Sequence, residues 1–123
     1  MVNSTFNGKL NILESQFKND VYLDEIVEYI RTTKENKTYP RKLKILTDSL
    51  QASFKFSVND LNTIIYEKNK SLEEYDVVID ALIIDSSQTA ALAVLYQELA
   101  KSEKYFFNVF STREAALIWL EDF

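Results

Sequence analysis

The chain contains no cysteine, no histidine and a single glycine, Gly8, in 123 residues. Phosphate-cradling loops need several glycines, because their backbone N–H groups must approach the phosphates closely. Structural zinc sites, cysteine nucleophiles and Ser-His-Asp triads need cysteine or histidine. These shortages argue against most familiar catalytic and cofactor-binding motifs. We therefore expect a protein that is not an enzyme, that uses no metal or cofactor, and that acts by binding.

Long apolar runs are also missing. No segment approaches the ~18 apolar residues of a membrane span, and Met1 to Asp20 contain no apolar core of a signal peptide. Because cysteine is absent too, the expected location is cytoplasmic. Hydrophobic residues make up 46% and aromatic residues 13% of the chain, which argues for a packed core and against disorder. The length predicts one domain over residues 1–123.

Charge is unevenly distributed. The net charge of −5 disfavours binding to nucleic acid. Residues 31–44, however, carry six Lys or Arg side chains and only one acidic side chain, Glu35. Such a run is commonly a solvated helix end followed by an exposed loop. The alternative is a basic surface that meets an anionic ligand or partner.

Strand-like and helix-like patterns alternate along the chain. The spacing of apolar residues predicts strands over 9–17, 43–47, 75–84 and 105–110, with a loop over 50–56. It predicts helices over 22–35 and 57–70, a third that Asp85-Ser86-Ser87 opens and that ends near Lys101, and a fourth after Ser111. Asn7-Gly8 predicts a turn and a small hairpin before the first of these strands. Alternation of this kind is typical of an α/β domain with a largely parallel sheet.

The C-terminal third carries a more specific pattern. A strand at Asp80–Asp85, an Ala/Leu-rich helix, a strand at Phe107–Thr112 and an ending with Trp119-Leu120 follow in order. This pattern resembles the SpoIIAA-like proteins of the STAS superfamily, and Leu43–Asp48 fits the same order upstream. The resemblance implies an α/β fold, with a mixed sheet of four or five strands flanked by about four helices. It also implies a regulatory or ligand-binding role.

Ser57 occupies the position that the resemblance links to regulation. In anti-sigma-factor antagonists of the superfamily, a serine at a helix start, within Asp-Ser-Ser-Gly, is phosphorylated by a partner kinase. That motif is absent around Ser57. Ser57-x-x-Asp60 instead has the form of a helix capping box, as does Ser111-x-x-Glu114. Capping is the simpler interpretation of Ser57, and phosphorylation is the alternative.

Candidate ligand-binding residues follow two of the expected strands. Open α/β sheets bind ligands beyond the carboxyl ends of their strands. We therefore expect Asp48 with Ser49, and Asp85 with Ser86, to line one crevice. Ser57 is a further candidate ligand-binding residue. The alternative for Asp85 is a helix cap. A hydrolase that uses Asp48, Asp85 and Ser49 is the least favoured hypothesis, because their spacing does not single them out.

Arg41 and Lys42 belong to the basic segment, and we expect them to meet the head group of an anionic ligand.

Asp80 is unusual because it interrupts the apolar run of the expected strand 75–84, where an isolated charge is unfavourable. Either a bulge turns Asp80 outward or a basic residue such as Arg41 or Lys44 pairs with it.

The segment 90–96 is apolar on every side of its expected helix, which is typical of a helix buried on two sides. We expect Ala90, Val94 and Tyr96 to form a homodimer interface. The alternatives are the roof of an apolar pocket and cover by the last helix.

Taken together, the sequence predicts a homodimeric binding or regulatory module that contacts a regulatory protein partner. The alternative is a carrier or sensor of a small apolar or amphipathic anionic ligand.

Overall fold

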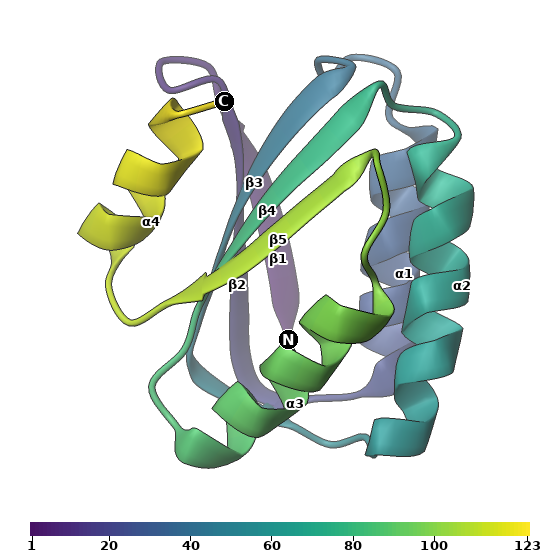
Figure 1. Cartoon of the computed structure of the whole chain (residues 1–123), viewed down its shortest axis with the longest axis vertical. Coiled ribbons are helices and arrows are strands. Elements are labelled where there is room, and N and C mark those ends of the chain that lie inside the picture. The colour runs from purple at the N-terminus through teal and green to yellow at the C-terminus, as the bar shows by residue number, and fades with distance from the viewer.

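The computed structural model describes residues 1–123, apart from the side chain of Gln88. Figure 1 shows a central sheet with helices on both of its faces. In chain order the elements are β1 (Val2–Asn7), β2 (Ile12–Val21), α1 (Leu23–Glu35), β3 (Lys42–Phe54), a 3-10 turn η1 (Val58–Asp60), α2 (Leu61–Leu72), β4 (Val77–Ile83), α3 (Ser87–Leu99), β5 (Tyr105–Phe110) and α4 (Arg113–Glu121). Among the described residues, no helix is both long and apolar enough to cross a membrane.

The five strands lie in the sheet in the order in which they occur in the chain. β1 and β2 form an antiparallel hairpin, and β2, β3, β4 and β5 run parallel to one another. Gly8 lies in the hairpin turn. The expected mixed sheet and the expected hairpin are therefore confirmed.

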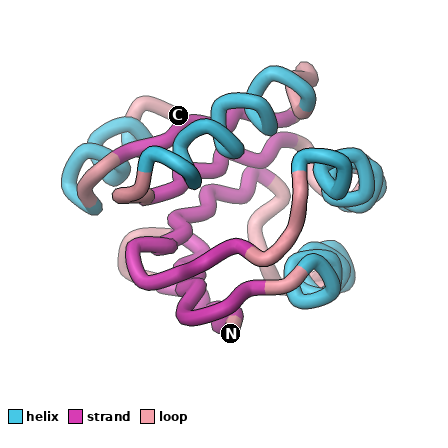
Figure 2. Tube along the Cα trace, turned by 90° about the horizontal axis from the view of Figure 1, so that it is seen from below, coloured by secondary structure: helices cyan, strands magenta, loops and turns pink.

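The sequential strand order decides where the helices lie. Each helix that joins two parallel strands makes a right-handed crossover. Every crossover here moves one strand further in the same direction, so α1, α2 and α3 lie on the same face of the sheet. Figure 2 shows α4 on the opposite side. Along each strand, alternate side chains face these two layers.

Each face of the sheet has its own apolar core. Leu13, Leu43 and Ile45 are buried in the core beneath α2 and the loops that follow it. The other face buries Ile79 against Leu120 of α4. The Trp119 ring packs against Phe110 and Phe123, at centroid distances of 5.5 and 5.0 Å. The Trp-Leu ending therefore packs into this core.

The expected end of the second parallel strand was wrong. β3 does not stop at Thr47 but continues to Phe54, through residues that the sequence pattern placed in a loop. A register shift against β2 falls beside Ser49, where β3 holds one extra residue. The buried Ser49 hydroxyl donates to the Ile83 carbonyl at 2.6 Å. A β-bulge of this kind accommodates polar residues within a continuing strand.

The outer edge of the sheet at β5 is joined to α3. β5 pairs only with β4, so the backbone groups of alternate residues point away from the sheet. The Gln97 side chain on α3 donates from Nε2 to the Phe107 carbonyl at 2.8 Å. α3 thus supplies a partner for the edge strand that it precedes.

Polar side chains mark the beginnings of two helices. The Ser57 N–H donates to Asp60 Oδ2 at 2.9 Å, so the capping interaction expected there is confirmed. At α4 the capping residue is Thr112, whose hydroxyl oxygen accepts from the Ala115 N–H at 3.2 Å. The expectation of a cap at Ser111 was therefore wrong by one residue. Pattern alone places helix ends only to within a residue or two.

Replacement of the α4 cap offers a test of this assignment. We expect Thr112→Ala to lower the free energy of unfolding by about 1 kcal/mol, because it removes the acceptor for an end N–H group of the helix. Ser111→Ala is the matched control and should change stability by less than about 0.5 kcal/mol. Urea unfolding of both variants measures the difference. A larger loss for Ser111→Ala than for Thr112→Ala would contradict the assignment.

Candidate ligand pocket

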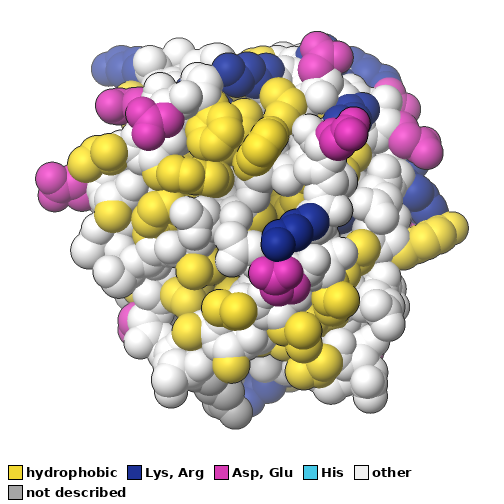
Figure 3. Space-filling model, viewed as in Figure 1, with side chains coloured by type: hydrophobic (Ala, Val, Ile, Leu, Met, Phe, Trp, Pro, Cys, Tyr) yellow, Lys and Arg dark blue, Asp and Glu magenta, His cyan; other side chains and the backbone are white. Residues whose placement is uncertain are grey.

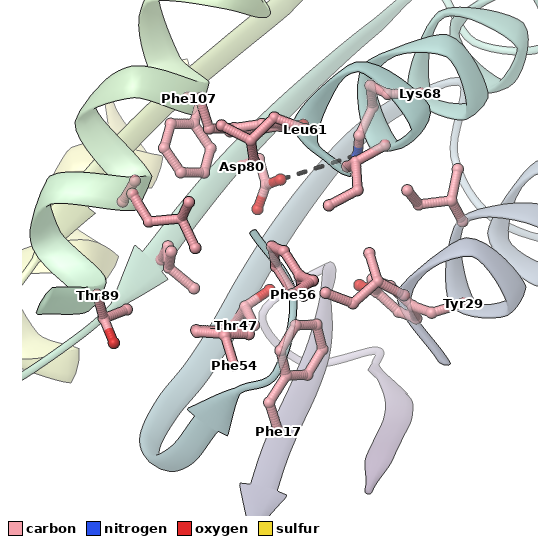
Figure 4. A pocket seen from close by; sticks show the side chains of 17 residues that line it. Phe17, Tyr29, Thr47, Phe54, Phe56, Leu61, Lys68, Asp80, Thr89 and Phe107 are labelled. Carbon is pink, nitrogen blue, oxygen red and sulfur yellow. Dashed lines mark ion pairs between the residues drawn. The ribbon is translucent and has the colours of Figure 1, made fainter. Parts of the chain in front are cut away.

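A pocket of about 110 Å³ lies between the sheet and the three helices α1, α2 and α3, and it is partly open to solvent. Its wall is mostly apolar and aromatic. Figure 4 shows Phe17, Phe54 and Phe56 on one side of the space and Phe107 on the other. The rings of Phe17 and Phe54 pack edge to face, with their centroids 6.1 Å apart. The rings of Phe54 and Phe56 do the same, with their centroids 5.6 Å apart. Edge-to-face packing of this kind is favourable and stabilises the positions of the rings in the pocket wall.

A buried ion pair forms the polar part of this wall. The ammonium Nζ of Lys68, on α2, lies 3.9 Å from Oδ2 of Asp80, on β4 (Figure 4). The side chains are only 10% and 14% exposed, so both charges are largely removed from water. The register of the sheet places Asp80 between Ile45 of β3 and Phe107 of β5. Because these cross-strand neighbours are apolar, the opposite charge comes from the helix above the strand.

Two tyrosines extend the pair into a hydrogen-bonded chain. The Tyr105 hydroxyl donates to Asp80 Oδ2 at 2.7 Å. The Tyr96 and Tyr105 hydroxyl oxygens are 3.0 Å apart. Since the Tyr105 proton is directed to Asp80, Tyr96 is the donor in that second contact. Lys68 Nζ also lies 4.8 Å from the centre of the Tyr105 ring, so the ring faces a cation that it can attract.

Burial shifts the protonation equilibria of this chain. It lowers the pKa of Lys68, and the nearby Asp80 carboxylate opposes that effect in part. It raises the pKa of Tyr105 well above the ordinary value, and the Asp80 charge adds to the rise. Tyr96 has a raised pKa for the same two reasons. Both tyrosines therefore remain hydroxyl donors across the physiological pH range.

A second polar contact lies across the pocket. The Tyr29 hydroxyl on α1 and the Ser15 hydroxyl on β2 are 2.5 Å apart. Burial is the main cause that raises the pKa of Tyr29. Thr47 lines the pocket near this contact (Figure 4). Among the described residues, no group of three or more carboxylates could hold a metal ion.

Comparisons with known proteins support the fold. No protein-family model matches the chain, and no curated protein matches it significantly. The crystal structure of an uncharacterized DUF3478-family protein from Shewanella loihica PV-4, described as having a SpoIIAA-like fold, superposes with a TM-score of 0.65. The match covers 97% of this chain and 93% of that chain at 12% sequence identity. The fold is SpoIIAA-like.

The SpoIIAA-like fold confirms the expected α/β class, but it does not collect the expected ligand-binding residues into one site. Asp48 and Ser49 lie within β3, where Asp48 Oδ1 accepts from the Leu50 N–H at 3.0 Å. Asp85 is exposed. Ser86 caps α3 by accepting from the Thr89 N–H at 3.1 Å. The side chains of Asp48, Ser49 and Ser86 thus each form a hydrogen bond with a backbone group of the protein.

Arg41 and Lys42 lie at the other end of β3, where Lys42 begins the strand and pairs with Val77 of β4. The Arg41 guanidinium donates to the carbonyls of Tyr39 and Glu74, both at 2.6 Å, and lies 4.3 Å from the centre of the Tyr75 ring. Arg41 therefore joins two loops. Lys42 is exposed. These two residues do not line the pocket.

The strand order provides no reversal at which a crevice would be expected at the strand ends. Ligand crevices of open α/β sheets arise where the strand order reverses, because helices on opposite faces separate there. The order β1 to β5 contains no reversal. In this SpoIIAA-like sheet the pocket described above lies between the sheet and the helices instead.

Asp80 has an ion-pair partner, as one of the two alternatives predicted, but the partner is Lys68 and not Arg41 or Lys44. Sequence reasoning missed Lys68, although a signal was present. Leu61, Ile64 and Leu72 form the buried stripe of α2, and Lys68 lies within the same stripe. A lysine at such a position needs a buried partner.

Helix α3 presents different residues to its two sides. Tyr96, expected in a dimer interface, is turned inward, because its ring lines the pocket and its hydroxyl contacts Tyr105. Val94 is 52% exposed, and Ala90 is half-buried. Apolar side chains form patches over α3 and β5, separated by charged side chains (Figure 3). Of the three residues, Val94 is therefore the most exposed.

Removal of one member of the buried pair tests its energetic role. We expect Asp80→Ala to destabilise the protein by roughly 3–5 kcal/mol, because Lys68 is left as an unpaired buried charge. The double variant Lys68→Met with Asp80→Ala should recover at least about 1 kcal/mol of that loss. Glu74→Ala, which breaks the exposed pair with Lys37, serves as the control and should cost about 1 kcal/mol or less. Strictly additive losses in a double-mutant cycle would show that Lys68 and Asp80 are not coupled.

Proposed function

We propose that the protein is a non-enzymatic carrier or sensor of a small, mainly apolar molecule that binds in the pocket between the sheet and helices α1, α2 and α3. The observation that carries this proposal is an aromatic-lined space with one paired set of charges in its wall. Small-molecule sites are usually concave, mostly apolar and provided with a few convergent polar groups. The pocket has each of these properties.

The volume of the pocket sets the size of the ligand. An engineered protein cavity of roughly 150 Å³ with an apolar lining binds benzene. The pocket of about 110 Å³ is of the same order and is partly open. It suits a group the size of a short branched chain or a single ring, from which a longer ligand would extend toward solvent.

The charges of the pocket favour binding over chemistry. The charge of Asp80 is balanced by Lys68, its Oδ2 accepts from the Tyr105 hydroxyl, and the Tyr105 oxygen accepts in turn from Tyr96. The basic segment 31–44 contributes no lining residue, so an anionic head group would not meet Arg41 or Lys42 there. We therefore favour an apolar ligand over an amphipathic anion.

Filling the pocket should abolish binding. Ala93 is buried and lines the pocket from α3, so Ala93→Leu places three further carbon atoms at its wall. Val94→Leu, at the exposed neighbouring position, is the matched control. We expect benzene to shift the amide NMR signals of the lining residues in the wild type and in Val94→Leu, but not in folded Ala93→Leu. Benzene-induced shifts elsewhere, or equal shifts in Ala93→Leu, would count against the proposal.

The native ligand can be sought directly. Native mass spectrometry of the protein purified from its own host reads bound mass and subunit number together. A noncovalent adduct that is lost on denaturation, and that is absent from Ala93→Leu prepared in the same way, supports the carrier or sensor function. A ligand retained by Ala93→Leu would place its binding outside the pocket.

A second candidate function is a partner-binding module, either as a homodimer or with a regulatory protein. The exposed apolar side chain of Val94 on α3 favours it, as do Phe106 on β5 and Ile118 on α4, which are 43% and 58% exposed. Isolated exposed apolar residues are common, but residues gathered into patches mark interaction surfaces.

Val94→Glu tests this second function. Because Val94 is half exposed, we expect the variant to remain folded by circular dichroism. If α3 forms the homodimer interface, light scattering will show a wild-type dimer and a Val94→Glu monomer, since a buried unpaired carboxylate opposes association. A wild-type monomer, or a variant that remains dimeric, would remove the homodimer interface at α3.

A further inference from the structure

The two groups of the buried ion pair are too far apart to form a hydrogen bond with each other. The 3.9 Å between Lys68 Nζ and Asp80 Oδ2 exceeds the 2.7–3.2 Å or so of an N–H···O hydrogen bond. Among the described side chains, Lys68 has no hydrogen-bond partner within the protein, and Asp80 accepts one hydrogen bond, from Tyr105. Both groups line the pocket. An unfilled donor and an unfilled acceptor thus lie side by side at its wall.

The charge of this wall is balanced before any ligand enters. Lys68 and Asp80 are the charged residues among those that line the pocket, and their charges cancel. An anionic head group would pair with Lys68 but also meet the Asp80 carboxylate. A cationic head group would meet the Lys68 ammonium. Either would leave one net charge against a mostly apolar wall, which is unfavourable.

A neutral head group that both donates and accepts avoids this cost. Its oxygen can accept from the Lys68 ammonium while its N–H donates to the Asp80 carboxylate. Hydrogen bonds to charged groups are stronger than those between neutral groups. A primary carboxamide carries the acceptor oxygen and the donor nitrogen on the same carbon atom, which suits the neighbouring positions of Lys68 and Asp80.

We infer that the pocket selects small apolar molecules that bear a neutral, amide-type head group, which bridges Lys68 and Asp80. This inference rests on the proposed function, because it requires the pocket to admit a ligand. The aromatic wall holds the apolar body, and the ion pair fixes the orientation of the head. Selectivity comes from charge. A carboxylate analogue of the same shape would be repelled by Asp80, and an ammonium analogue would be repelled by Lys68.

Three molecules of nearly identical shape test the inference. Isovaleramide, isovalerate and isopentylammonium share one branched chain and differ in the charge of the head group. NMR titrations of the wild-type protein at pH 7 should give at least tenfold tighter binding of isovaleramide than of either ion. Equal or tighter binding of isovalerate or isopentylammonium would overturn the inference.

Two variants should reverse the order of preference. Asp80→Asn removes the negative charge, so isovalerate should become the tightest of the three ligands. Lys68→Met removes the positive charge, so isopentylammonium should become the tightest of the three ligands in that variant. Lys70→Met is the matched control, because Lys70 lies on the same helix but pairs with Glu67 away from the pocket, and it should keep the wild-type order. An unchanged order in folded Asp80→Asn or Lys68→Met would overturn the inference.

Benzene separates failure of this inference from failure of the proposed function. If benzene shifts the pocket residues but isovaleramide gains no advantage over the two ions, the selectivity is wrong and the pocket remains a ligand site. If none of the four molecules shifts the lining residues, both proposals are wrong. Should neither variant of the ion pair fold, the order of the three branched ligands on the wild-type protein decides the question.

Discussion

A charged carboxylate on a central strand must be met by an opposite charge or by hydrogen bonds, and this requirement organises one side of the molecule. Asp80 lies between Ile45 and Phe107 in the sheet, so neither of the side chains directly opposite it can pair with its charge. Lys68 descends from α2, and Tyr105 approaches from the edge strand. The contacts of one side chain thereby fix the position of a helix, an edge strand and, through Tyr96, a second helix. The pocket is the space that these elements enclose.

The sequential order of the strands is the second constraint. It places three crossover helices on one face, leaving α4 to cover the other (Figure 1). Helices pack about 8–10 Å apart whereas strands are spaced at about 4.8 Å, so the three helices do not match the four parallel strands one to one. Large aromatic side chains such as Phe17, Phe54 and Phe107 occupy most of the remaining volume. In this arrangement an interlayer pocket follows from topology, whereas a crevice at the strand ends would need a reversal of strand order.

Much of the fold could be predicted from the sequence because its signals are local. The turn at Gly8, the helical spacing after Tyr22 and the apolar run before Asp85 each act over a few residues. The extension of β3 could not be predicted in this way, since its bulge depends on pairing with β2 and on the bond from Ser49 to β4. The site was harder still. Asp80 was conspicuous by its charge, but its pairing with Lys68 joins two elements that only the three-dimensional packing brings together.

The contact between Gln97 and the Phe107 carbonyl also bears on how copies of the protein meet. Unpaired groups on an edge strand invite a strand from another chain, which is a common route to aggregation. By occupying the middle of β5 with a side chain from its own preceding helix, the protein discourages growth of the sheet at that edge.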